Sequence, residues 1–544
     1  NHDNNSFLLE QIKRKSYRKP ATGAAVELVG PSSNPVFGGG DESNIVSHTP
    51  WNRHTFVTND NASSNVMKIY NEGGTLKVRN AGLPKLATSP TVTAGGAGAE
   101  NFIYAFVYYY TYTIGSTTFE DFGAVTQVSL ANALAPNVSA VSITNIPVIA
   151  NGATENYDTA NIKVYIFRTQ NNGTTFTFVK QITNGTTSTT DNASDASIAS
   201  NLLLYTTGGV VDNDPPPKAR FIHTAGDLTL YGYVTESGQV KPNRIRQGIK
   251  SDPDSCPESF FLDIDDELTG ISSVQNVHIV FTKKFCYRID GFFDELGRGG
   301  MQALRISDIA GCLSNQSIVQ VDQGIYYAGP DGFYFCDGYK CAKVSRDIPT
   351  TYNNFVTGDS GDTAAEVALK QKRIYGCHDP QNRRVLWAVN SEFSNDNDSI
   401  ACLHMYWGLR DDMPVTLWSN DDLADHFSPT ALMFFTTAAT GQNISELLRG
   451  DRRGYLFKHR EGTDFTDPRV DTNEDVENWG TVAIIYDYVS VAMNFGTNLV
   501  RKFVPRILVQ ADNETNLSLQ VNSLNDANPA TKPLREIRYR GNKI

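Results

Sequence analysis

Five short segments of this 544-residue chain have the pattern of paired antiparallel strands, and no long helical pattern separates them. In each segment, aromatic or β-branched residues alternate on both sides of a Gly, Asp or Pro turn, which is the sequence signature of a β-hairpin. The segments are 225–233, 282–291, 324–338, 373–390 and 447–462. Diverged hairpins that recur at intervals of roughly 45–70 residues are typical of the blades of a β-propeller. We therefore predict an all-β fold with a β-propeller over residues 218–470.

The N-terminal part of the chain predicts two segments of different character. Residues 1–50 are polar and turn-rich, and they predict an extended arm that either becomes ordered against a neighbour or is a frayed terminus. Residues 51–94 contain two weakly alternating runs on either side of the turn Glu72-Gly73-Gly74. This pattern predicts a hairpin that contributes to the propeller or to a platform.

Residues 95–210 predict an inserted β-sandwich. About seven short strand-like runs in about 110 residues, joined by polar turns, match the size of an immunoglobulin-like or fibronectin type III sandwich. A Tyr-rich run at 102–110 is followed by Glu120-x-x-Gly123, Tyr165-x-x-Arg168-Thr169 and Phe176-x-x-Val179. This order resembles fibronectin type III modules, and the resemblance implies a domain that mediates contacts.

Two further segments complete the expected domain organisation. Residues 211–217 include three consecutive prolines and predict a stiff linker between the sandwich and the propeller. Residues 471–544 predict a small C-terminal β platform. A strand-like run at 537–542 indicates that its sheet is completed either by residues beyond this sequence or by another subunit.

The charge of the chain is unevenly distributed. The formal net charge of −12 argues against a protein that coats nucleic acid and fits a surface that repels DNA. One acidic cluster comprises Asp263, Asp265, Asp266 and Glu267. A basic cluster near the N-terminus comprises Lys13, Arg14, Lys15, Arg18 and Lys19. The basic cluster either contacts an acidic partner surface or DNA, or is a solvated terminal charge run.

Seven cysteines occur at 256, 286, 312, 336, 341, 377 and 402, without CxxC spacing. This distribution predicts reduced thiols that are buried as small apolar side chains, and it fits synthesis in a reducing cytoplasm. Cys336 and Cys341 are the closest pair, but they flank a turn and have no His neighbour, so we predict neither a disulfide nor a metal site. No run approaches the roughly 20 apolar residues of a membrane span, and no signal-peptide pattern is present, which predicts a soluble protein.

Two motifs match catalytic or metal-binding patterns only in part. Gly358-Asp359-Ser360-Gly361 matches the nucleophile loop of serine proteases, but no histidine has a recognisable partner context, and Thr363 predicts the start of a short helix. Alternating acidic residues at 471–477 resemble a calcium loop, but Val476 stands where that loop requires Gly. We predict no enzyme activity, no cofactor and no metal.

A run of short motifs within residues 218–348 suggests a family. The motifs are Lys218–Phe221, Ala225–Asp227, Leu230–Gly232, Lys241–Ile245, Ser251–Pro253, Pro257–Phe260, Ile279–Lys284, Tyr287–Gly291, Gly311–Ser317 and Gly324–Gly338. Together they resemble the tail nozzle or tail hub proteins of short-tailed bacteriophages (podoviruses). The motifs include no catalytic signature.

The resemblance implies a structural protein of the virion. Members of this family form a homohexameric ring of propeller and platform domains around a DNA channel, below the tail adaptor. Such a ring would retain the viral double-stranded DNA, conduct it during ejection and anchor tail fibres. The acidic cluster at 263–267 is then a candidate for the channel lumen, where negative charge would let DNA slide. Two alternatives remain, namely a receptor- or glycan-binding propeller of the tail and a propeller hydrolase.

Overall fold

The computed structural model describes most of the chain. The described residues are 8–12, 15–19, 26–31, 45–61, 64–207, 213–345, 348–358, 361–391, 397–405, 415–419, 429–439, 442–451, 456–458, 466–469, 480–483, 518–525 and 528–538. The chain divides into two compact units, Asn1–Asp487 and Tyr488–Ile544. Nearly all regular elements are antiparallel strands, which confirms the predicted all-β class.

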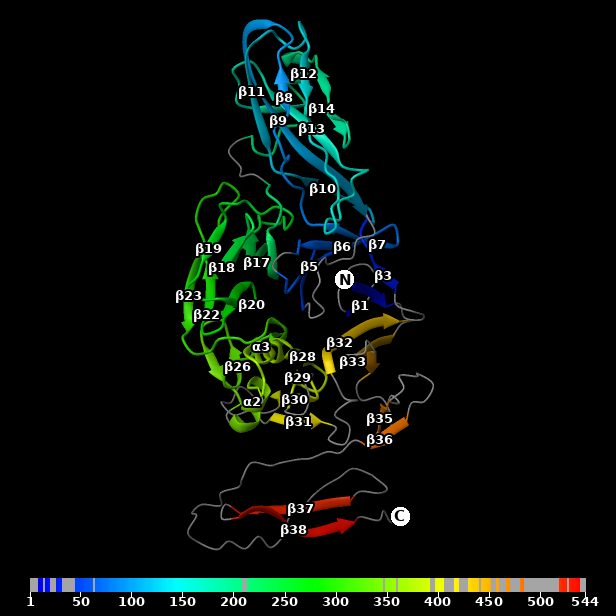
Figure 1. Cartoon of the computed structure of the whole chain (residues 1–544), viewed down its shortest axis with the longest axis vertical. Coiled ribbons are helices and arrows are strands. Elements are labelled where there is room, and N and C mark those ends of the chain that lie inside the picture. The colour runs from blue at the N-terminus through cyan, green and yellow to red at the C-terminus, as the bar shows by residue number, and fades with distance from the viewer. Residues whose placement is uncertain are drawn as a thin grey trace. The chain divides into compact units, whose positions relative to one another are not determined.

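Six antiparallel sheets follow one another along the first unit, each built from strands consecutive in the sequence. We call them meanders 1 to 6; Figure 1 shows their strands. Meander 1 contains β4 (Val46–Trp51), β5 (His54–Asn59), β6 (Met67–Glu72) and β7 (Thr75–Asn80), and meander 2 contains β16 (Lys218–Ala225), β17 (Leu228–Glu236), β18 (Gln239–Gln247) and β19 (Phe261–Asp263). Meander 3 contains β20 (Leu268–Val274), β21 (Val277–Thr282), β22 (Cys286–Asp290) and β23 (Gln302–Ser307), and meander 4 contains β24 (Val319–Val321), β25 (Gly324–Ala328), β26 (Phe333–Cys336) and β27 (Cys341–Lys343). Meander 5 contains β28 (Tyr375–Asp379), β29 (Arg384–Val389), β30 (Ser399–His404) and β31 (Val415–Ser419), and meander 6 contains β32 (Pro429–Ala439), β33 (Gln442–Asp451) and β34 (Leu456–Lys458).

The five hairpins expected from the sequence are all present, and each belongs to a different meander. They correspond to the pairs β16–β17, β21–β22, β25–β26, β28–β29 and β33–β34. Local turn chemistry explains the pairing within the meanders. Gly73 and Gly74, for example, adopt φ angles of 58° and 84° between β6 and β7, as a two-residue hairpin turn requires.

Consecutive meanders pack against each other, and an apolar cluster fills each gap. One cluster joins Phe56 of meander 1 to Tyr231 of meander 2, and others join meanders 2 to 3, 3 to 4, 4 to 5 and 5 to 6. The first strands β4, β16, β20, β24, β28 and β32 contact one another in this order. This serial packing of five four-stranded sheets and one sheet with three described strands is propeller-like.

Residues of the later meanders also contact meander 1. The short 3-10 helix η1 (Asn315–Ser317) lies before β24, and the Gln316 side chain donates a hydrogen bond to the carbonyl oxygen of Val46. Lys372 Nζ lies 2.8 Å from Asp60 Oδ2. The series of sheets therefore curves back toward its beginning.

A module of two sheets is inserted between meanders 1 and 2. Its elements are β8 (Thr91–Thr93), β9 (Ala97–Ile114), β10 (Thr117–Phe122), β11 (Thr126–Ala133), β12 (Val141–Thr144), β13 (Lys163–Thr169), β14 (Phe176–Thr183), β15 (Thr189–Asp191) and α1 (Asp195–Ile198). One sheet has the order β10-β9-β13-β14 with β11 also paired to β9, and the other has the order β15-β12-β8. A shared core containing Phe106 and Ile143 lies between them. The buried Arg168 of β13 crosses this core to Asp191 of β15, with Nε and Oδ2 2.9 Å apart.

The boundaries near the N-terminus differ from the predicted ones. Meander 1 begins at Val46, so the predicted arm over residues 1–50 includes most of β4. Residues 8–28 also contain a three-stranded sheet, β1 (Leu8–Ile12), β2 (Lys15–Lys19) and β3 (Val26–Leu28). The predicted hairpin in 51–94 is β6–β7, within a complete four-stranded sheet. The sequence of β4 hides this strand because Ser47, His48 and Thr49 are consecutive polar residues and the following Pro50 weakens a strand pattern.

The boundaries near the C-terminus also differ. A strand pair, β35 (Thr466–Arg469) and β36 (Gly480–Ala483), spans the expected boundary at 470/471. The second compact unit begins at Tyr488 and contains the hairpin β37 (Ser518–Asn525) and β38 (Asn528–Arg538). Of the predicted linker 211–217, residues 211 and 212 lie outside the described residues, and the backbone oxygen of Asp214 accepts a hydrogen bond from Cys256 N.

Helices are few and short. Within the described part of the chain, α1 has 4 residues, α2 (Pro349–Val356) has 8 and α3 (Ala364–Lys372) has 9, and no helix is long and apolar enough to cross a membrane. The predicted helix start at Thr363 is confirmed. Its side chain and that of Glu366 form a reciprocal capping box at the start of α3.

Candidate functional site

The predicted acidic cluster lies at one end of meander 3. Asp263 ends β19, and Asp265, Asp266 and Glu267 form the connection to β20. Each of the four carboxylates has a partner. Arg244 binds Asp263 with two nitrogens, Arg305 Nη2 lies 2.8 Å from Asp265, Lys284 N donates to Asp266, and Lys283 pairs with Glu267. These partners neutralise much of the negative charge, and the lumenal role stays a prediction.

The predicted basic cluster lies partly outside the described residues. Lys13 and Arg14 are not among them, whereas Lys15, Arg18 and Lys19 belong to β2. Strand β2 pairs with β1 and β3 on its two sides. The basic residues that are described therefore lie on the central strand of a small sheet, and their contact with a partner stays a prediction.

A buried charged junction joins meander 1, the inserted module and meander 2. Lys68 of β6 is 1% exposed, and its Nζ lies 2.5 Å from Asp121 Oδ2 of β10 and 3.1 Å from Asp254 Oδ2 in the β18–β19 connection. Tyr112 places its hydroxyl oxygen 3.3 Å from the same nitrogen. Asp254 also accepts a hydrogen bond from Gly82 N at 2.7 Å. One cation thus holds three parts of the fold together.

Burial governs the protonation of this junction. Desolvation raises the pKa of Asp121 to about 7, although the attraction of Lys68 acts in the opposite direction and repulsion from Asp254 adds to the rise. The two carboxylates raise the pKa of Lys68 well above its usual value despite its burial. Lys68 therefore stays charged, and Asp121 is the group in this junction that titrates near neutral pH.

The junction lies beside a cavity whose charged lining residues pair with one another. A cavity beside it is lined by Lys68, Arg79, Asp121 and Asp158, among other residues. Lys68 pairs with Asp121, and Arg79 Nη2 lies 3.2 Å from Asp158 Oδ2. These charges bind one another. Of the segment Gly358–Gly361, which matches a protease loop only in part, Asp359 and Ser360 lie outside the described residues.

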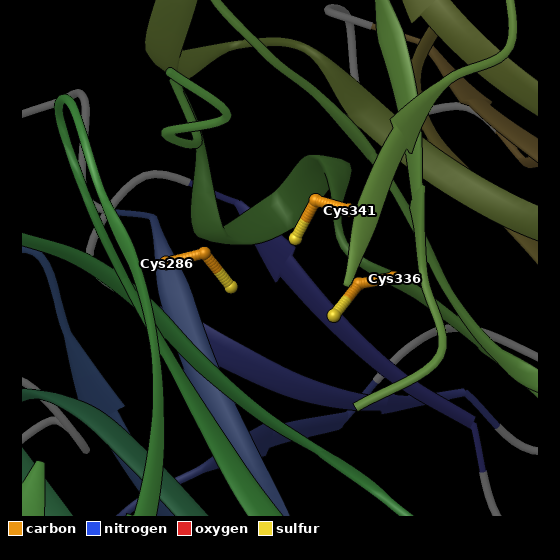
Figure 2. A group of neighbouring side chains, drawn as sticks. All are labelled: Cys286, Cys336 and Cys341. Atoms are coloured by element: carbon orange, nitrogen blue, oxygen red, sulfur yellow. The ribbon is translucent and has the colours of Figure 1, made fainter. Parts of the chain in front are cut away.

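Three thiol groups converge between meanders 3 and 4, and Figure 2 shows them pointing toward one another. Cys286 is the first residue of β22. Cys336 ends β26 and Cys341 begins β27, where the two residues are direct register partners. The three sulfur atoms all lie within 4.8 Å of one another. Cys286 and Cys336 are fully buried, and Cys341 is half-buried.

We call Cys286, Cys336 and Cys341 the thiol triad. Hydrogen bonds and burial shift the pKa values of its thiol groups in opposite directions. Hydrogen bonds from the Cys286 and Cys336 thiols lower the pKa of Cys341 to about 4. Burial raises the pKa of Cys286 well above its usual value. Gly338 N donates a hydrogen bond to Cys336 Sγ at 3.4 Å. The triad therefore favours one thiolate that accepts hydrogen bonds from the other two thiols.

The sequence identified two members of the thiol triad and missed the third. Burial of the cysteines is confirmed for six of the seven, since only Cys341 is half-buried. Three of these thiols, Cys286, Cys336 and Cys341, lie close together in space although they are far from CxxC spacing in the sequence. Cys286 lies in another sheet, and only the packing of meander 3 against meander 4 brings it near. The Cys336-x4-Cys341 spacing was the available signal, because metal-binding cysteine pairs include spacers of two to four residues.

Comparisons with known proteins identify no family for this chain. No family model matches the sequence, and no curated protein matches it. Among solved structures, a puromycin hydrolase is similar with a TM-score of 0.27 and 10% identity over 82% of this chain, which spans 57% of that protein. Two structures of AztD from Citrobacter koseri, one of them the apo form, match 62% of the chain and 93% of AztD. Their TM-scores are 0.19 and 0.18, and their identities are 10% and 11%. Likeness at this level carries no conclusion about activity.

Proposed function

We propose that this chain is a structural subunit of the tail of a short-tailed bacteriophage, a nozzle or hub that forms a hexameric ring around the DNA channel. The ring retains the genome, conducts it during ejection and anchors tail fibres. One observation carries the proposal. The motifs that resemble tail nozzle proteins, within residues 218–348, fall on meanders 2, 3 and 4, so they belong to one continuous piece of scaffold.

We further propose that the six meanders are blades of a β-propeller and that the inserted module is of fibronectin type III kind. Support for the propeller comes from the separate apolar cluster in each gap between consecutive meanders and from the ordered contacts of their first strands. The contacts of Gln316 and Lys372 with meander 1 also favour a series that closes on itself. The two-sheet core of the inserted module is compatible with a fibronectin-like sandwich.

The distribution of charge supports a scaffold rather than a hydrolase. A hydrolase requires titratable groups that converge on space for a substrate. At the junction, Lys68, Asp121 and Asp254 bind one another, and in the module Arg168 binds Asp191. These groups hold parts of the fold together.

Electron microscopy of the purified full chain tests the assembly. We expect class averages with sixfold symmetry and an axial bore, and a mass close to six copies of the 59.8 kDa chain. A monomeric particle without a bore would contradict the proposal. A trimer that binds glycans on an array would favour the receptor-binding alternative.

Charge reversal in the acidic connection tests the lumenal role. Asp265→Lys changes the charge in the β19–β20 connection, at the end of meander 3 where β21 also turns into β22. Glu295→Lys is a matched control, because the exposed Glu295 lies in the β22–β23 connection at the opposite end of the same sheet. In particles assembled with each variant, we expect Asp265→Lys alone to slow DNA release at low salt, because phosphate contacts with Lys are salt-dependent. Equal release rates in the two variants would remove Asp265 from the lumen.

A further inference from the structure

We propose that the thiol triad, Cys286, Cys336 and Cys341, is a binding site for a thiophilic d10 cation, Zn²⁺ or Cu⁺, that links meander 3 to meander 4. Three cysteines from two sheets place their sulfur atoms within 4.8 Å of one another. This site is independent of the proposed role in a phage tail.

The spacing of the sulfurs is close to that of a metal-thiolate site. A zinc–sulfur bond of about 2.3 Å places tetrahedral ligand sulfurs about 3.8 Å apart. From separations of up to 4.8 Å, small side-chain rotations bring the three sulfurs to that distance. Three thiolates leave one position of a tetrahedron for water or another small ligand, and three sulfurs alone suit trigonal Cu⁺. A disulfide would use two of the sulfurs and leave the third without a role.

The chemistry of the triad selects soft cations. Thiolate ligands favour Zn²⁺ and Cu⁺, whereas Mg²⁺ and Ca²⁺ require oxygen ligands. The sulfurs lie in an apolar core that includes Ile279, Phe281 and Ile325. In this core the charge on a thiolate is poorly solvated, so a bound cation would stabilise it.

The β26–β27 turn holds two of the ligands in place before any metal binds. Gly338 adopts a φ of 91°, which favours glycine, and its N–H donates to Cys336 Sγ. The Asp337 side chain accepts hydrogen bonds from the backbone nitrogens of Tyr339 and Lys340, both at 2.9 Å. N–H bonds to a ligand sulfur and a fixed turn are the outer-shell contacts that orient metal ligands. The turn is therefore preorganised for Cys336 and Cys341.

The surroundings also provide access and charge balance. Cys341 is half-buried, so an ion can enter from its side. Arg288 follows Cys286 by two residues, which places both on one face of β22. Its guanidinium lies 4.8 Å from the centre of the Tyr339 ring in the β26–β27 turn. Three thiolates and one divalent cation carry a net charge of −1, and Arg288 lies on this face of β22, where it also pairs with Asp290 at 3.0 Å.

Cobalt is a direct probe of this site, because Co²⁺ replaces Zn²⁺ and shows sulfur-to-metal charge-transfer absorption with thiolates. The full chain is purified under reducing conditions, stripped with a chelator and titrated with Co²⁺. We expect saturation at about one ion per chain, with band intensity typical of three thiolates, and loss of the band on adding Zn²⁺. A separate titration with Cu⁺ under a competing chelator shows which of the two ions binds more tightly.

Two variants separate coordination from packing. Cys341→Ser removes a half-buried ligand, and we expect the cobalt band to fall by at least tenfold. Cys312→Ser is the matched control, since Cys312 is buried in the same apolar cluster but lies outside the triad, and its hydrogen bonds to Ser314 O and Ser317 Oγ suit a hydroxyl. We expect this control to keep the full band.

Three results would overturn the proposal. The first is a wild-type chain, folded by circular dichroism, that shows no charge-transfer band with Co²⁺ and retains no Zn²⁺ or Cu⁺. The second is a disulfide between any two of the three cysteines, found by alkylation and mass spectrometry of protein isolated without reductant. The third is an undiminished band in Cys341→Ser. The wild-type titration decides the matter even if neither variant folds.

Discussion

Replacing Lys68 by methionine tests whether the buried junction holds three parts of the fold together. Methionine keeps the length and the apolar stem of the side chain and removes its charge. The substitution leaves Asp121 and Asp254 facing each other without a cation. Asp254 keeps its hydrogen bond from Gly82 N, so Asp121, which is 9% exposed, is the group left without compensation.

The expected cost depends on pH. Removing one partner of a buried ion pair destabilises a protein by about 3–5 kcal/mol, and we expect this cost at pH 8. The part of this cost that comes from Asp121 is limited by protonation of its carboxyl group in place, at about 1.4 kcal/mol for each pH unit above its folded pKa of about 7. This part is roughly 1.4 kcal/mol at pH 8 and close to zero at pH 5. In the wild type, Asp121 has a pKa of about 7 and is already largely protonated at pH 5, so the ion pair contributes less there.

Thermal unfolding of the full chain at pH 5 and pH 8 measures this difference. If meander 1 and the inserted module melt as one unit of about 150–250 residues, 4 kcal/mol lowers the Tm of that transition by roughly 8–16 °C. Arg298→Met is the control, because its pair with Asp294 is 72% and 44% exposed and is therefore screened by solvent. The double variant Lys68→Met with Asp121→Asn should recover about 1.4 kcal/mol of the loss at pH 8 and almost none at pH 5. A Lys68→Met shift no larger than that of Arg298→Met, or equal shifts at both pH values, would refute the reasoning.

Three further predictions concern single buried groups. Arg168→Met should destabilise the inserted module by about 3–5 kcal/mol, because it leaves the fully buried carboxylate of Asp191 without its cation; a normal melting curve would contradict this. Trp387→Phe should cost about 1–3 kcal/mol in chemical unfolding, because the indole no longer donates to Ser317 O at 2.9 Å, and an unchanged midpoint would count against that bond. Burial lowers the pKa of His278 to about 3, so the stability that it contributes is complete above pH 6.5 and is lost as pH falls through the folded value. His278→Phe should remove roughly 3 kcal/mol of the acid-induced loss between pH 6.5 and 4, and identical pH profiles would show that this histidine does not carry it.

Local patterns account for the parts of the fold that could be predicted. The hairpin at 324–338 is recognisable because Gly329 to Gly332 form a turn between two aromatic runs, and both features lie within a few residues of each other. The start of α3 is recognisable for the same reason, since Thr363 and Glu366 cap it within one turn. Strand β4 was missed because it contains three consecutive polar residues and a proline, and it becomes a strand through its pairing with β5 and its contact with β16.

The sequence by itself determined the five central hairpins, their turns and their serial order, because alternation and turn residues act over short distances along the chain. Only the tertiary structure decided which groups from different sheets meet. The partners of Lys68 lie 53 and 186 residues away, and Cys286 joins Cys336 and Cys341 only where two sheets pack face to face. Burial between sheets also sets the protonation of these groups, since desolvation and neighbouring charges exist only after the sheets have come together.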